Sequence, residues 1–134
     1  MTTPPSDVLQ IRTSDDVVFV RQQVRARAIQ AGLGLVDQTK VVTAASELAR
    51  NTLDYGGGGS VILSSIDDGV RHGVRLVFED HGPGIADIQL ALKDGYTTGT
   101  GLGLGLGGAK RLSSEFLIES AVGAGTRVTI ARWK

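Results

Sequence analysis

The sequence has no cysteine, no excess of charge of either sign and no long apolar run. Without cysteine, disulfide bonds and thiolate metal sites are excluded, and the composition fits a reducing cytoplasm. Lysine plus arginine equals aspartate plus glutamate at 14 each, so no field of one sign favours nucleic acid or a membrane surface. No apolar run approaches the roughly 18 residues of a membrane span, and the first residues lack the regions of a signal peptide. Residues 1–134 are therefore expected to form a single soluble, cytoplasmic domain.

Hydrophobic periodicity predicts helices first and then a mostly antiparallel sheet. Strands are expected at 7–13, 60–66, 70–79, 115–121 and 126–133, and helices at 14–31, 37–55, 85–92 and 104–113. Asp37 is expected to cap the second helix. The second and third strands, joined by Asp67-Asp68-Gly69, have the pattern of a hairpin. The fold class predicted is α+β, a two-layer α/β sandwich with helices on one face of a mostly antiparallel, mixed sheet.

Glycine is concentrated in one stretch, with seven glycines from Gly95 to Gly108. Glycine loses much backbone entropy on ordering, so this run suits a segment that brings bare N–H groups to an anion or that moves. Residues 103–108 satisfy G-x-G-x-x-G, but no βαβ unit surrounds them, and Lys110 is followed by Arg111 rather than by the Ser or Thr of a Walker loop. The remaining interpretation is a phosphate-enclosing lid that leads into a helix N-terminus.

Glu47 and Asn51 lie one turn apart on the second predicted helix, on the side opposite its apolar residues. A solvated polar face is the ordinary explanation for such a pair. If the glycine loops fold over it, however, the Asn51 carbonyl oxygen suits Mg²⁺. Glu47 could then take a proton from a nucleophile.

A second polar motif, Asp80-His-Gly-Pro-Gly84, directly follows an apolar strand. One interpretation is a tight turn capped by the aspartate. The other is a nucleotide site, in which glycines let a flat base approach and Asp80 accepts a hydrogen bond from the adenine amino group. Guanine offers an acceptor at that position and would be repelled. His81 and His72 lie in or near turns, so a histidine metal site is not expected.

These pieces, in this order, resemble the GHKL family of ATP-binding domains (gyrase, Hsp90, histidine kinase and MutL), also called the Bergerat fold. The N box is Glu47-x-x-x-Asn51, the first glycine box Asp80-x-Gly82-x-Gly84, and the second spans 99–108. Within this family the chain is similar to the RsbT-type serine/threonine kinases of the stressosome. Proline is expected at position 107, and Gly107 there is predicted to loosen the junction between the loop and its helix.

The resemblance implies a role for each matching residue. Asn51 would hold Mg²⁺ against the phosphates of ATP, Asp80 and Thr126 would read adenine, and Glu47 would be the catalytic base. Gly82 and Gly84 would shape the base pocket, and Lys110 would add charge near the phosphates. The backbone amides of the second box would enclose the phosphates: Gly101, Leu102, Gly103, Leu104, Gly105, Leu106, Gly107 and Gly108.

The resemblance also implies a function and partners. The chain would phosphorylate a STAS-domain scaffold protein (RsbS/RsbR-like) and, once released, activate a PP2C-type phosphatase (RsbU-like) through its regulatory domain. The alternative is an RsbW/SpoIIAB-like anti-sigma factor, which binds a sigma factor and uses ATP to switch partners. A histidine-kinase role is less expected, because no helical phosphoacceptor domain is recognised in residues 1–134, and a gyrase-like role is less expected because no transducer domain is recognised there.

Overall fold

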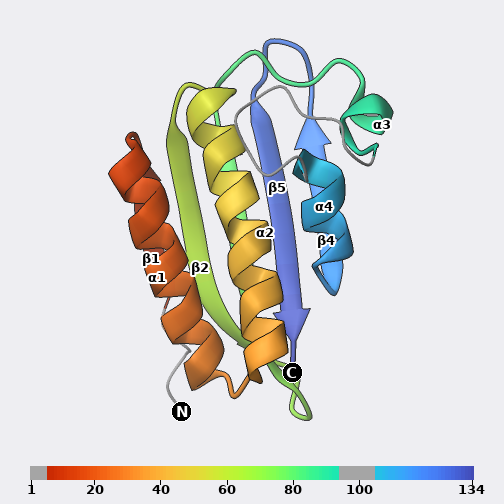
Figure 1. The fold of residues 1–134 in the computed structure, drawn as a ribbon. Coiled ribbons are helices and arrows are strands. Elements are labelled where there is room, and N and C mark those ends of the chain that lie inside the picture. Colours follow the sequence, from red (N-terminus) through yellow and green to blue (C-terminus); the bar gives the residue numbers. More distant parts are fainter. Residues whose placement is uncertain (1–5, 94–104) are drawn as a thin grey trace.

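The structure, a computed structural model, describes residues 6–93 and 105–134, and it is a sheet with helices packed on one of its faces (Figure 1). The strands are β1 Ser6–Ile11, β2 Gly59–Asp67, β3 His72–Asp80, β4 Glu115–Ser120 and β5 Thr126–Trp133. The helices are α1 Ser14–Gln30, α2 Leu35–Asp54, α3 Ile88–Ala91 and α4 Gly105–Arg111. The predicted α+β class is confirmed.

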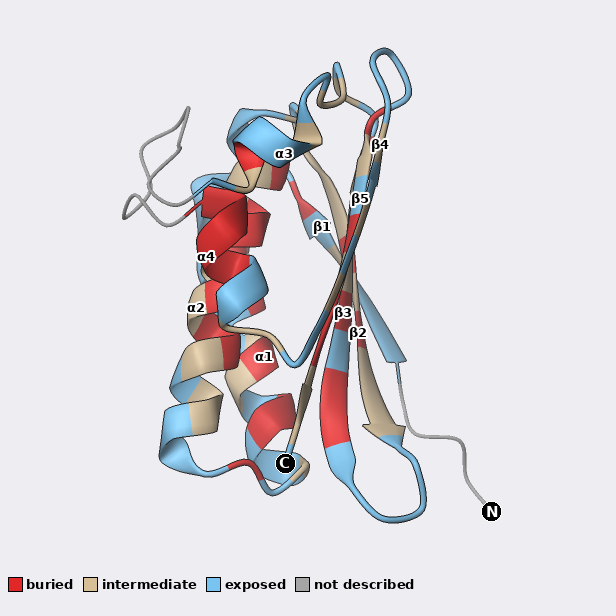
Figure 2. Cartoon of the chain, turned by 90° about the vertical axis from the view of Figure 1, so that its right-hand side faces the viewer, coloured by how far each residue is buried: buried red, intermediate tan, exposed pale blue. Residues whose placement is uncertain are grey.

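The five strands are ordered β1-β2-β3-β5-β4, and each neighbouring pair is antiparallel. The predicted hairpin is present as β2 and β3, and its turn is closed by Asp68, whose Oδ1 accepts from the backbone N–H groups of Val70 and Arg71 at 3.0 and 2.6 Å. Alternate residues of each central strand face the helices and are buried, as in Val74, Leu76 and Phe78 of β3. The core therefore lies between the sheet and the helices, as Figure 2 shows.

The first helix is capped as its sequence predicts, and the second is not. Thr13 and Asp16 form a capping box at the start of α1, with the Thr13 side chain accepting from Asp16 N–H at 3.2 Å. The prediction that Asp37 caps α2 is wrong, because α2 begins at Leu35 after Gly34 and has no side-chain cap. Asp37 instead accepts a 2.7 Å hydrogen bond from Arg132 Nη2 and joins the first turn of α2 to β5.

The helices cover the sheet in a fixed arrangement, with α2 packed between α1 and α4 (Figure 1). The 3.6-residue spacing of the sequence predicts one buried side for α2, and all five of its members are buried: Val41, Ala45, Leu48, Ala49 and Thr52. Antiparallel pairing brings the end of β3, the start of β5 and the end of β4 into one row. The C-terminal end of α2 lies over the same end of the sheet (Figure 1).

Among the helices within 6–93 and 105–134, none is long and apolar enough to cross a membrane.

Candidate functional site

A cavity of about 430 Å³ lies where the C-terminal end of α2 meets the ends of β3 and β5. This volume is in the range of small-molecule sites, about 300–1,000 Å³. The described residues that line it come from five segments: Leu48, Asn51, Thr52, Tyr55 and Gly56; Phe78 and Asp80; Pro83, Gly84, Ile85, Ala86, Asp87, Leu90 and Ala91; Gly105 and Leu106; and Thr126 and Val128. The structure thus brings Asn51, Asp80, Gly84, Gly105, Leu106 and Thr126 of the predicted site to one cavity.

The floor of the cavity carries a buried carboxylate. Asp80 is 9% exposed and its Oδ1 accepts from the backbone N–H of Gly82 at 2.8 Å. In the β3–β5 register Asp80 faces Thr126 directly. The Asp80 carboxylate and the Thr126 hydroxyl therefore lie side by side at the base of an otherwise largely apolar cavity.

Two glycines around Asp80 are required by close packing. A Cβ at Gly82 would lie 2.7 Å from Gly56 Cα, so Gly82 is placed to let the turn approach the end of α2 rather than to line the cavity. Gly84 has a positive φ of 78°, and a Cβ there would overlap the Ala121 carbonyl. Both of these predicted residues shape the turn through contacts with other segments of the chain.

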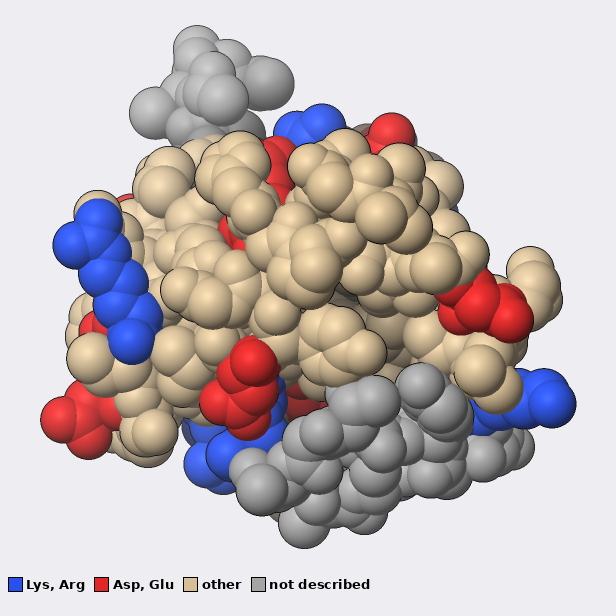
Figure 3. All heavy atoms as spheres, turned by 90° about the horizontal axis from the view of Figure 1, so that it is seen from above, with Lys and Arg blue, Asp and Glu red and all other residues tan. Residues whose placement is uncertain are grey.

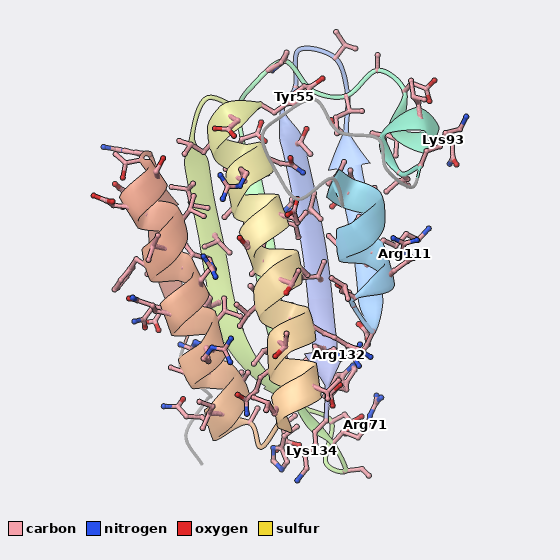
Figure 4. All side chains as sticks on the ribbon, in the orientation of Figure 1. Tyr55, Arg71, Lys93, Arg111, Arg132 and Lys134 are labelled. Atoms are coloured by element: carbon pink, nitrogen blue, oxygen red, sulfur yellow. The ribbon has the colours of Figure 1, made fainter. Side chains whose placement is uncertain are left out.

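Gly56 takes part in the site although its sequence environment does not single it out. A Cβ at this position would lie 2.6 Å from Asp80 Oδ2, so the carboxylate occupies the space that a side chain would fill. Its sequence signal is its place at the start of a run of four glycines, 56–59, which by itself indicates only the end of a helix. The neighbouring Tyr55 is 48% exposed at the cavity end of α2 (Figure 4).

Ser120 is a second residue that the sequence analysis missed. Its Oγ accepts from Ile85 N–H at 2.8 Å, donates to the Gly125 carbonyl at 2.9 Å and lies 2.8 Å from Thr126 Oγ1. Ser120 thereby joins the Asp80–Ile85 turn to the β4–β5 turn. The sequence does offer one signal for Ser120. In β4 every second residue faces the core, and after the apolar Phe116 and Ile118 the next such position is the polar Ser120.

The second glycine box is described only from Gly105 onward; residues 99–104, which include the predicted site residues Gly101, Leu102, Gly103 and Leu104, lie outside the described residues. Gly105 and Leu106 line the cavity at the start of α4. Gly107 and Gly108 are buried, whereas Lys110 is exposed in the last turn of α4 and is not among the lining residues.

Gly107 packs against the segment that follows α3. A Cβ at Gly107 would overlap the Leu92 carbonyl oxygen and lie 3.3 Å from that of Lys93. Gly107 therefore permits the close approach of α4 to residues 92–93. The predicted loosening concerns the loop before α4, which lies outside the described residues, so it stays a prediction.

Glu47 lies on α2 one turn before Asn51, as predicted, but it is not solvated. It is 5% exposed, so the alternative of a solvated polar face is wrong for this residue. Asn51 is half-buried and lines the cavity, while Glu47 is not among the lining residues. α4, which carries the end of the second glycine box, packs against α2.

The cavity end of the molecule carries few charges at its surface. Seen from above in Figure 3, acidic and basic side chains are scattered, with no field of one sign. Within the described ranges no three His, Cys, Asp or Glu side chains gather as a metal site. A single amide oxygen such as that of Asn51 fits Mg²⁺ bound together with nucleotide, because Mg²⁺ takes most of its ligands from phosphate and water.

Comparison with known proteins identifies the family. Residues 36–134 match the family described as "Histidine kinase-, DNA gyrase B-, and HSP90-like ATPase". The serine/threonine-protein kinase RsbT of Bacillus subtilis is 42% identical over 125 residues, covering 93% of this chain and 94% of that protein. The anti-sigma F factor of Geobacillus kaustophilus is 32% identical over 127 residues, covering 89% of this chain and 85% of that protein.

Solved structures share the fold at low sequence identity. The RsbU and RsbW domains of a Mycobacterium tuberculosis protein match with a TM-score of 0.66 at 22% identity, over 99% of this chain and 33% of that one. The mycobacterial sensor histidine kinase MprB matches with a TM-score of 0.57 at 17% identity, over 96% of this chain and 97% of that one. Family match and close relative together show that the chain belongs to the GHKL ATPase family and, within it, to the RsbT-type serine/threonine-protein kinases.

Proposed function

We propose that residues 1–134 act as a single ATP-dependent protein kinase domain that transfers the γ-phosphate of ATP to a serine or threonine of a STAS-domain partner. The observation that carries this proposal is the convergence of Asn51, Asp80 and Thr126 on one cavity, beside the start of the α4 glycine segment. The likeness to RsbT over nearly the whole chain supports the choice of kinase among the activities of the family.

Asp80 and Thr126 are proposed to bind the adenine base. The Asp80 carboxylate is held by Gly82 N–H through Oδ1 and keeps Oδ2 as an acceptor for the 6-amino group. The apolar side chains around it, including Phe78 and Leu106, suit the faces of a flat ring. A 6-oxo purine would set acceptor against acceptor at this position.

Asn51 is proposed to hold Mg²⁺, which would supply positive charge to neutralise the phosphates of ATP. Asn51 is half-buried at the cavity wall, on a helix that packs against both β3 and α4. Because α2 is held on two sides, the Asn51 amide oxygen would be kept in place to receive the ion. The amides of Gly101–Gly108 are proposed to enclose the phosphates, with Lys110 adding positive charge.

Glu47 is proposed as the base that receives the proton of the incoming hydroxyl. One helical turn, about 5.4 Å, separates it from Asn51, so the same rigid helix sets its distance from the metal-bound phosphate. General-base help contributes roughly 10²–10⁴-fold, while most phosphoryl-transfer catalysis comes from positioning and charge neutralisation.

The test is phosphate transfer from labelled ATP to a purified STAS-domain protein. Glu47→Gln should bind ATP as the wild type does and transfer phosphate at least about 100-fold more slowly, whereas Asn51→Ala should weaken binding of magnesium nucleotide. Full kinase activity in Glu47→Gln would show that Glu47 is not the catalytic base. No transfer by the wild type, with ATP bound, would remove the kinase assignment itself.

The released kinase is proposed to activate a PP2C-type phosphatase through its regulatory domain, in a cytoplasmic stress-response pathway. A second candidate function, binding of a sigma factor, is favoured by the 32% identity to an anti-sigma F factor over most of the chain. Pull-downs with a sigma factor and with the phosphatase regulatory domain separate the two. Capture of sigma factor without STAS phosphorylation would reverse the ranking.

A further inference from the structure

The hydroxyl groups of Ser120 and of the cavity residue Thr126 have only one consistent arrangement of protons. Ser120 Oγ carries a single hydrogen, and it lies 2.9 Å from the Gly125 carbonyl oxygen, which can only accept. That hydrogen is therefore used on Gly125. Ile85 N–H donates to the same Oγ at 2.8 Å. Thr126 Oγ1, 2.8 Å away, must then be the donor to Ser120.

Thr126 consequently has no hydrogen left for a ligand. Its hydroxyl proton points to Ser120, so toward the cavity it presents only lone pairs. Asp80, its partner across the β3–β5 pair, is an acceptor as well. Ser120, Thr126 and Asp80 thus form one row across β4, β5 and β3, in which the outermost residue sets the hydrogen-bonding character of the middle one.

We propose that Ser120 is a positioning residue for nucleotide specificity: it fixes the Thr126 hydroxyl as an acceptor, and the site therefore selects purine nucleotides with a 6-amino group over those with a 6-oxo group. This inference rests on the proposed adenine-nucleotide site. Without Ser120, the Thr126 hydroxyl rotates freely and can donate to a 6-oxo group. Discrimination then depends on Asp80 alone.

The test is calorimetric binding of ATP and of inosine triphosphate, its 6-oxo counterpart, to the full chain with Mg²⁺. Ser120→Ala should reduce the preference for ATP by about fivefold, the worth of one hydrogen bond between neutral groups. Ser120→Thr keeps the hydroxyl and should keep the preference. In a Thr126→Val background, adding Ser120→Ala should change the preference no further.

A purely structural role predicts a different result, because a displaced turn weakens both nucleotides by the same factor. Equal loss for the two, or an unchanged ratio, would overturn the inference. Ser114→Ala is the matched control. Ser114 Oγ accepts a 3.2 Å hydrogen bond from Trp133 N–H and does not line the cavity. The ratio of ATP affinity to inosine triphosphate affinity in Ser114→Ala should equal that of the wild type.

Two further outcomes are separable. If Ser120→Ala does not fold, Ser120→Cys carries the test, because a thiol of similar size is a weak acceptor and should lower the preference in the same way. A wild-type chain that binds ATP with an adenine preference which Ser120→Ala retains would overturn only the role of Ser120. A wild-type chain that binds neither nucleotide would overturn this inference together with the proposed function.

Discussion

A methyl group at Gly56 should disable the nucleotide site by displacing Asp80, with every residue proposed to bind nucleotide left unsubstituted. In Gly56→Ala the new Cβ would lie 2.5 Å from Asp80 Cβ and 2.6 Å from its Oδ2, distances at which something must move. Gly56 is not among the glycines with positive φ, so the substitution adds no backbone strain. The conflict is therefore confined to the buried Asp80 side chain.

The magnitude follows from what Asp80 loses when it turns away. Its 2.8 Å hydrogen bond from Gly82 N–H is broken, and hydrogen bonds to charged groups are worth about 1.5–3 kcal/mol. The same displacement removes the acceptor proposed for adenine. ATP affinity should therefore fall by roughly 10- to 100-fold, and overpacking should lower the free energy of unfolding by about 1–3 kcal/mol.

Calorimetry with Mg-ATP and urea unfolding measure the two effects separately. Gly34→Ala is the matched control, because nothing lies within 4 Å of a Cβ at this position. Gly34 lies at the N-terminal end of α2, whereas the cavity lies at the C-terminal end. It should bind ATP as the wild type does. Wild-type affinity in Gly56→Ala would show that Asp80 is not needed in its observed position, and the reasoning would fail.

Three further substitutions test the scaffold. Hydrogen bonds from the backbone N–H groups of Arg71 and, to a smaller extent, Val70 lower the pKa of Asp68 from 3.8 to about 2. The ionised carboxylate therefore stabilises the fold above pH 3.8, and this stabilisation is lost as the pH falls through about 2. Asp68→Asn should accordingly flatten the acid unfolding curve between these two pH values. Asp7→Ala removes the carboxylate that lies 2.6 Å from buried Arg27 Nη2. The free energy of unfolding, measured in urea, should fall by only about 1 kcal/mol, because Asp7 is exposed and solvent screens the ion pair. Asp37→Asn breaks the ion pair to Arg132, at the end of the molecule opposite the cavity (Figure 4), and should lower stability by about 1 kcal/mol with ATP affinity unchanged. An unaltered acid unfolding curve in Asp68→Asn would contradict the first expectation, and unaltered stability in Asp7→Ala the second. Weakened ATP binding in Asp37→Asn would contradict the third.

The elements of this fold are visible in its sequence because they follow local patterns. β5 spans Thr126–Trp133 as predicted, and the apolar positions of α2 are buried as its periodicity indicates. The predicted start of α2 is wrong because a local rule was applied to a residue with a distant partner. An aspartate near a helix start is read as a cap, but Asp37 is drawn to Arg132, which is distant in the sequence.

The residues that complete the site could not be predicted because their roles depend on contacts between distant segments. The residues near Gly56 in the sequence do not predict that the Asp80 side chain occupies the space beside it. Ser120 acquires its role only when Ile85 and Thr126 arrive on either side. The helical period places Glu47 one turn before Asn51, but no periodicity reports that this carboxylate is buried.

The central claim is that an adenine nucleotide with Mg²⁺ binds between the end of α2 and the Asp80 turn. Calorimetric titration of the full chain with Mg-ATP, alongside Asp80→Asn, tests this claim most directly. Saturable binding of one nucleotide per chain, weakened at least about tenfold by Asp80→Asn, is the predicted result, since the asparagine amide can set a donor against the 6-amino group. No binding heat from the wild type, or equal affinity in Asp80→Asn, would contradict the account.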